Sequence, residues 1–190
     1  MKSQSMNKHY RTLIQQREKL FPTLQSLEKV QLWEKPKANK WSIGETMYHL
    51  YLMIKTARIA ASITIPSTTL VARRRRHKPF AADIHDIYTE YKEKHGKGMK
   101  APFILNPPKK IHNTMDFTEL TQLLNNETSN VVKMVENIDE DIAGHIIFLD
   151  PVAKYPNLIQ AMQLLAIHEA HHFRIIQRDL EPLTEKTDTE

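Results

Sequence analysis

The stretch from Leu158 to Leu180 constrains the fold most strongly, because no proline or glycine interrupts it. Its apolar residues recur at a helical period and form one stripe, and His168 and His172 lie on the same stripe. Two residues four apart sit one above the other on a helix face. The stretch therefore predicts a long amphipathic helix with two inward-facing imidazoles. The apolar positions of the stripe are Leu158, Ala161, Leu165, Ile175 and Ile176.

Two inward imidazoles need partners, because burying a polar side chain without one is costly. One interpretation is a pair of core histidines that are hydrogen-bonded to their neighbours. The other is a shared metal ion, which the four-residue spacing of His168 and His172 favours. His171 points about a quarter-turn away on an ideal helix, so we expect it at the surface or beside the ligands.

Length and composition limit the class of protein and the kind of metal site. A chain of 190 residues suits one domain with a buried core, which we expect over residues 1–180. The polar, acidic segment 181–190 is expected to be a disordered tail. The chain has no cysteine, which excludes disulfides, zinc ribbons and iron–sulfur clusters. Any metal must bind nitrogen and oxygen ligands, which suits zinc, nickel, cobalt, manganese or iron(II).

The sequence contains no membrane or export signal. No apolar run approaches the roughly 20 residues that span a bilayer, and the first residues lack the apolar core of a signal peptide. We therefore expect a cytoplasmic protein without a membrane partner. The net charge of +5 permits nucleic-acid binding but does not require it.

Three further helices are predicted at about 7–30, from Ser42 to about 61, and at about 116–138. Pro22 predicts a kink or break in the first, and Ser42 with Glu45 forms a capping box at the start of the second. With only four glycines and no convincing strand, the chain is predicted to be all-α, a four-helix bundle.

The segment from Ile65 to Thr114 is too long for a turn, so we interpret it as a crossover between the second and third helices. A short helix is expected within it, at about 83–94. Such a crossover predicts an up-down-down-up arrangement of the four helices.

A basic run, Arg73–Arg76 with Lys78, lies in this crossover. It has no interleaved aromatic residues and no recognisable nucleic-acid-binding module, so we favour a solvated loop over a nucleic-acid interface. A third interpretation is that the run holds an anionic substrate at the mouth of the site.

The segment His168-Glu169-Ala170-His171-His172 matches the H-E-x-x-H helix of zinc peptidases, in which the glutamate is the general base. The longer form of that motif requires Gly and His where this chain has Ile175 and Arg178. Glu169 with His172 also matches half of a di-iron bundle site, but the second half is absent from the sequence. We therefore expect neither a peptidase nor a di-iron protein.

A third ligand must then come from another helix, and His49 is the best candidate. Three histidines with open positions are typical of a catalytic metal site. Glu45, one turn before His49, is a candidate for orienting its ring, and Glu169 is a second candidate for a supporting role.

At these residues the sequence resembles the DinB-like superfamily. The resemblance rests on Trp41-Ser42-Ile43-Gly44-Glu45 followed by His49-Leu50, on Lys100-Ala101-Pro102-Phe103, and on His168-Glu169-Ala170-His171-His172-Phe173-Arg174. It covers most of the chain, from the first helix to about Arg178. One departure is Ile175, where many members have glutamine.

The resemblance implies a four-helix bundle that binds a divalent metal, often nickel or zinc, on His49, His168 and His172. It also implies a homodimer. Some members resemble S-transferases that use bacillithiol, mycothiol or glutathione, and others are described as metal-dependent hydrolases.

The leading functional hypothesis is a metal-dependent transferase that activates a low-molecular-weight thiol against a small-molecule electrophile. A hydrolase that uses metal-bound water is the alternative enzyme. A non-catalytic, metal-binding stress protein is the alternative from another class.

Overall fold

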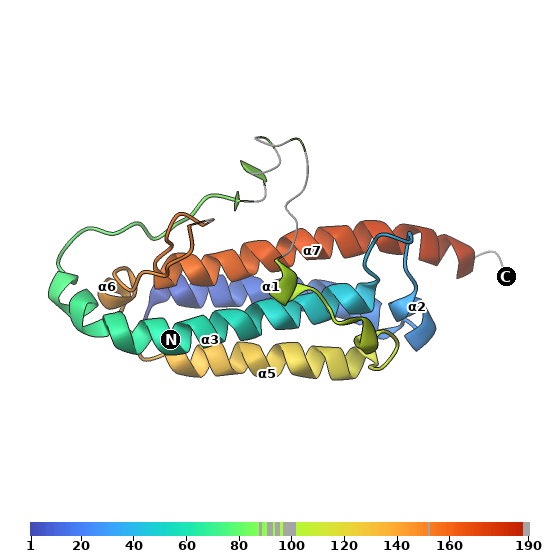
Figure 1. The fold of residues 1–190 in the computed structure, drawn as a ribbon, viewed down its shortest axis with the longest axis horizontal. Coiled ribbons are helices and arrows are strands. Elements are labelled where there is room, and N and C mark those ends of the chain that lie inside the picture. The colour runs from blue at the N-terminus through green and yellow to red at the C-terminus, as the bar shows by residue number, and fades with distance from the viewer. Residues whose placement is uncertain (88, 91–92, 94–95, 97–101, 152, 188–190) are drawn as a thin grey trace.

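The computed structural model describes residues 1–187 except 88, 91–92, 94–95, 97–101 and 152. The described residues are mainly helical, and their only β pairing is an isolated bridge between Ile147 and Asn157. Four long helices, α1, α3, α5 and α7, lie side by side (Figure 1). The all-α prediction is therefore confirmed.

Helix α1 (Gln4–Gln25) begins at Ser3, whose hydroxyl accepts a hydrogen bond from the amide of Met6. The predicted break at Pro22 does not occur, because α1 continues through it to Gln25. Proline removes one helical hydrogen bond, and the cost is limited where the helix ends within the same turn. The short helix α2 (Lys29–Trp33) follows.

Helix α3 (Ile43–Arg75) begins at the predicted capping box, in which Ser42 and Glu45 bond each other's backbone amides. The crossover was predicted to start at Ile65, and this is wrong, because α3 continues through Pro66. Just after Pro66, three side-chain hydroxyls donate to carbonyls one turn earlier. These donors are Ser67, Thr68 and Thr69.

The crossover therefore begins after Arg76 and runs to Asp116. Its described residues include two single turns of 3-10 helix, η1 (Phe103–Leu105) and η2 (Lys109–Ile111). The short helix predicted at about 83–94 lies partly outside the described residues.

Helix α5 (Phe117–Val135) begins at Asp116, which forms a capping box with Glu119. The short α6 (Glu140–Ala143) then leads to α7 (Leu158–Thr187). Residues 181–187, predicted as a disordered tail, are helical. Pro182 removes only the bond to one carbonyl, so it does not end a helix that leucine, glutamate and lysine continue.

The four long helices share one cluster of buried side chains, to which α1, α3, α5 and α7 all contribute. The colours of Figure 1 show α1 and α7 running one way along the bundle and α3 and α5 the other way, as in the predicted up-down-down-up order. A hydrogen bond of 2.8 Å from the amide of Lys2 to the carbonyl of Glu136 joins the start of α1 to the end of α5. Among the described helices, none combines the length and apolarity that crossing a bilayer requires.

Candidate metal centre

His49 lies on the second turn of α3, and its ring is 1% exposed. The capping box at Ser42 fixes the start of this helix and so the direction in which His49 projects. Its Nδ1 lies 2.8 Å from the carbonyl oxygen of Leu105, at the end of η1. A carbonyl oxygen only accepts, so Nδ1 carries the proton and Nε2 of the neutral ring carries the lone pair.

His168 and His172 project from successive turns of α7 toward this lone pair. The Nε2 atoms of His49 and His168 are 3.1 Å apart. One ligand atom from each of the three histidines lies within 4.8 Å of the other two. The structure thus brings together His49 and the predicted pair, although more than a hundred residues separate them in the sequence.

Burial keeps all three rings neutral. Burial first, and then the neighbouring His49 and His171, lower the pKa of His168 from 6.5 to about 3. Burial also lowers the pKa of His172 and that of His49. Neutral imidazoles have a free lone pair on one nitrogen, which is the form that binds a metal.

The geometry suits a divalent ion of borderline softness. Two nitrogens bound to one zinc ion at about 2.1 Å in tetrahedral geometry are separated by roughly 3.4 Å, close to the distance between His49 and His168. The bond from His49 Nδ1 to a backbone carbonyl is the support that metal-binding histidines commonly have. These three side chains could therefore hold such an ion and leave further positions for small molecules.

Trp41 covers one side of the cluster. Its ring lies 4.8 Å from that of His49 and 6.5 Å, nearly parallel, from that of His172, measured between centroids. Trp41 and His172 line a surface cavity of about 250 Å³ together with Lys40 and Arg178. We call it the charged cavity. It also contains Asp179, whose carboxylate accepts hydrogen bonds from Arg178.

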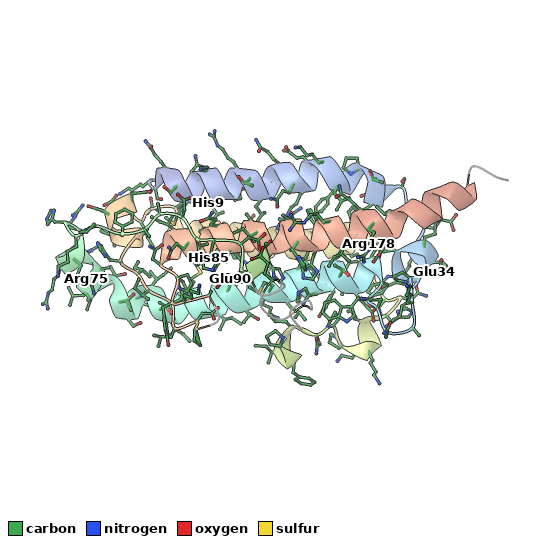
Figure 2. The ribbon with its side chains drawn as sticks, turned by 90° about the horizontal axis from the view of Figure 1, so that it is seen from above. His9, Glu34, Arg75, His85, Glu90 and Arg178 are labelled. Carbon is green, nitrogen blue, oxygen red and sulfur yellow. The ribbon has the colours of Figure 1, made fainter. Side chains whose placement is uncertain are left out.

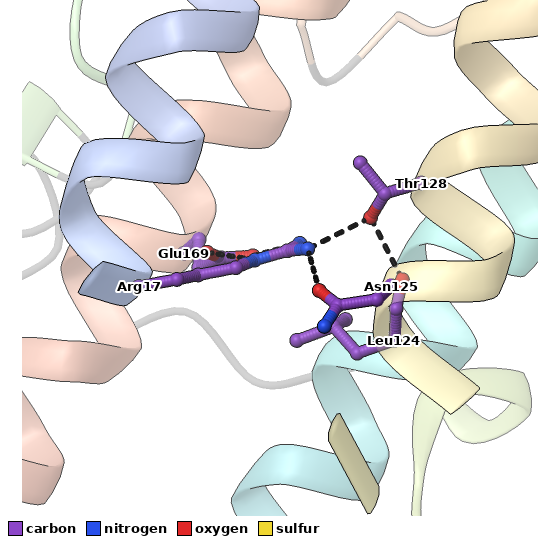
Figure 3. Close-up of polar contacts among 5 residues, drawn as sticks. All are labelled: Arg17, Leu124, Asn125, Thr128 and Glu169. Atoms are coloured by element: carbon purple, nitrogen blue, oxygen red, sulfur yellow. Dashed lines mark hydrogen bonds and ion pairs between the residues drawn. The ribbon is translucent and has the colours of Figure 1, made fainter. Parts of the chain in front are cut away.

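Glu169 meets Arg17 of α1 (Figure 3). Both carboxylate oxygens accept hydrogen bonds from Arg17, at 2.8 and 2.7 Å. Arg17 also donates to Asn125 and Thr128 of α5. Burial raises the pKa of Glu169, and the hydrogen bonds from Arg17 oppose the rise. Glu169 is thus a structural partner of Arg17, and its carboxylate does not bond the histidine rings in the described contacts.

Glu45, the other candidate for a supporting role, is also occupied elsewhere. Its carboxylate bonds the amide of Ser42 and pairs with Lys35 at 2.9 Å. Half-buried His171 lies beside the cluster, with its ring 5.2 Å from that of His172. Among the described contacts, the ring nitrogens of His49 are bonded by Leu105 and His168, not by Glu45.

The basic run lies far from the histidines. Arg73, Arg74 and Arg75 form the last turn of α3, roughly 39 Å along the helix from His49 at about 1.5 Å per residue. Figure 2 places Arg75 and Arg178 toward opposite ends of the bundle. The interpretation that this run holds a substrate at the site mouth is therefore wrong, because the helix carries it away.

Several residues around the centre were not anticipated. Lys40, Trp41 and Arg178 meet only because α7 packs beside the loop before α3. Leu105 contributes only a carbonyl, which has no side-chain signal. Arg17 did have a signal in the sequence, since this charged residue falls on the apolar stripe of α1 between buried Leu13 and Leu20.

A family model described as DinB superfamily matches residues 12–176 of the chain. The match includes all three histidines. Neither a curated protein nor a solved structure matches the chain.

Proposed function

The chain belongs to the DinB superfamily, and from this premise we propose that it is a metal-dependent enzyme that transfers a low-molecular-weight thiol to a small electrophile. The observation that carries the proposal is the convergence of three neutral imidazole nitrogens beside an open, charged cavity. His49, His168 and His172 would hold a divalent ion such as zinc or nickel. When bound, the ion lowers the pKa of a coordinating thiol, so that the thiol reacts as the thiolate.

The donor set supports a sulfur co-substrate. Three neutral histidines cancel none of the ion's two positive charges, so the centre favours an anionic ligand, and a thiolate suits a borderline-soft metal. The chain has no cysteine, so the sulfur must come from a separate molecule. In the reaction the sulfur bonds the electrophilic carbon, the leaving group departs with its electron pair, and the thiol proton goes to solvent.

Lys40 and Arg178 indicate which thiols fit. Both side chains are exposed and line the charged cavity beside His172. Asp179 neutralises part of this charge, and one net positive charge remains among the three. The cavity would therefore bind carboxylates of the thiol, as bacillithiol or glutathione carries them, while Trp41 excludes water from one side of the rings.

A peptidase receives no support from this site. A general base must reach the water or substrate at the metal. Both carboxylate oxygens of Glu169 instead accept hydrogen bonds from Arg17 of α1, and Glu169 is 1% exposed. We expect no metal-dependent cleavage of casein by the wild-type protein, and cleavage that is lost in Glu169→Gln would restore the peptidase hypothesis.

The decisive assay measures bimane fluorescence with monochlorobimane as the electrophile. We expect the metal-loaded protein to consume it only with a thiol, with bacillithiol exceeding 2-mercaptoethanol, and we expect His168→Ala to lose the rate. Equal rates for metal-free and metal-loaded protein with every thiol would contradict the proposal. Turnover of ester substrates without any thiol would indicate a hydrolase instead.

A second assay tests the charged cavity. Arg178→Ala should raise KM for bacillithiol about tenfold, the value of one charge-assisted hydrogen bond, and change KM for uncharged 2-mercaptoethanol little. Arg11→Ala, which removes an exposed arginine from α1, is the matched control. An equal change in KM for both thiols would show that Arg178 does not contact the thiol.

A further inference from the structure

A second cavity, of about 350 Å³, lies between α3 and α7. We call it the apolar cavity. On α3, small side chains recur at three- and four-residue spacing and so share one face. Small side chains on facing helices leave a space that leucines would fill. These residues are Ala57, Ala60, Ala61 and Thr64, and Ala161 of α7 also lines the cavity.

The apolar cavity starts one helical turn from the histidines. Met53, which lines it, is four residues after His49, and Leu165, on the opposite wall, is three residues before His168. Because α3 and α7 run in opposite directions, both walls lead away from the histidines toward the same end of the bundle. One turn is about 5.4 Å, so the near end of the cavity lies about that far along the helices from His49 and His168.

The two cavities differ in chemistry. Among the described residues, mainly aliphatic and aromatic side chains line the apolar cavity, and the one charged residue there is Asp150, which is exposed. No lysine or arginine is among the described residues that line it, so it has no positive side chain to bind an anion. The charged cavity, by contrast, has Lys40 and Arg178. The histidine cluster thus lies between a cavity suited to a charged thiol and a cavity suited to a neutral, apolar group.

We propose that the apolar cavity binds the hydrophobic part of the electrophile, which makes neutral, apolar electrophiles the preferred substrate class. This inference rests on the proposed function for its chemistry, but the binding itself does not depend on metal or thiol. Its volume lies within the usual range of small-molecule sites.

The first test uses the neutral fluorescent probe N-phenyl-1-naphthylamine and metal-free protein. We expect saturable binding by the wild type, and at least tenfold weaker binding by Ala57→Leu and by Ala161→Leu, which fill the cavity from opposite walls. Ser62→Leu adds the same side chain to an exposed position of α3 outside the cavity and should bind as the wild type does. Equal binding by all four proteins would overturn the proposal.

Circular dichroism and sedimentation velocity accompany the titration. If a second copy of the chain covered the cavity instead, the two leucine variants would change the oligomeric state and the wild type would not bind the probe, which would also overturn the proposal. Two variants on different helices keep the test valid if one of them fails to fold.

The second test separates this inference from the proposed function. With metal and bacillithiol present, Ala57→Leu should lower kcat/KM for monochlorobimane about tenfold more than for iodoacetamide, which is too small to need the cavity. If no electrophile reacts while the leucine variants still weaken probe binding, the thiol-transfer proposal fails and the binding site stands. If both electrophiles react and Ala57→Leu affects them equally, the thiol-transfer proposal stands and the cavity is not the electrophile site.

Discussion

Helix α7 carries two buried polar clusters on different faces, and their donors and acceptors are matched very differently. Toward α1, Glu169 meets Arg17, and Asn125 and Thr128 accept two further hydrogen bonds from the guanidinium (Figure 3). Toward α3, the rings of three histidines each bring a nitrogen atom to within 4.8 Å of the other two. The first cluster pairs opposite charges, whereas the second brings three neutral nitrogen ligands within reach of one ion.

This difference indicates that neighbouring residues of one motif, Glu169 and His168, have different roles. A buried ion pair that is hydrogen-bonded between helices favours one register of those helices. Convergent neutral nitrogens are arranged at a cost in desolvation, which a metal ion would offset. Glu169 is therefore paired within the scaffold, and His168, one residue earlier, is the residue that we propose as a metal ligand.

The largest expected effect comes from breaking the matched cluster. Arg17→Ala leaves the Glu169 carboxylate buried without a partner and should lower the free energy of unfolding by about 3–5 kcal/mol, measured by urea denaturation. The double variant Arg17→Met with Glu169→Met removes both charges and should be more stable than Arg17→Ala alone. If the double variant were the less stable of the two, the cluster would not act as a pair.

The next effect concerns the histidine cluster and the metal. Zinc or nickel at a hundred times its dissociation constant should stabilise the wild type by about 2.7 kcal/mol. His168→Ala should lose this stabilisation, whereas Arg17→Met with Glu169→Met should keep it. Thermal unfolding with and without metal measures both. Equal metal-dependent shifts in wild type and His168→Ala would remove His168 from the site.

The smallest effect concerns pH and the metal-free protein. The pKa of His168 is about 3 in the folded chain and about 6.5 when unfolded, so below pH 6.5 the unfolded chain binds the extra proton. Stability should therefore fall with falling pH, by about 2 kcal/mol for this ring between pH 6.5 and 5. His168→Gln, compared with wild type by urea denaturation at both pH values, should show a smaller loss. An equal loss would assign the pH dependence to other groups.

The sequence predicted the elements whose signals are local. Helical stripes located the four long helices, and Ser42 with Glu45 located the start of α3. The spacing of His168 and His172 predicted two members of the histidine cluster, and His49 was identified because it was the histidine beside a second buried stripe. The sequence motifs that contain these histidines resemble the DinB-like superfamily, and the family model that matches the chain is that of the DinB superfamily.

What the sequence did not predict depends on contacts between distant segments. The pairing of Arg17 with Glu169 and the meeting of Lys40 with Arg178 have no local pattern. Proline was given too much weight, since α1 and α3 continue through Pro22 and Pro66. The same error placed the basic run in a loop near the site, when helix α3 carries it to the far end.

The metal content of purified variants tests the central claim most directly. After mild chelation and dialysis against zinc or nickel, we expect about one ion per wild-type chain and per His171→Ala chain, because His171 lies beside the cluster and not in it. His49→Ala, His168→Ala and His172→Ala should each retain only a small fraction of that amount. Full occupancy in His49→Ala would contradict the account, because it would show that α3 does not supply the third ligand.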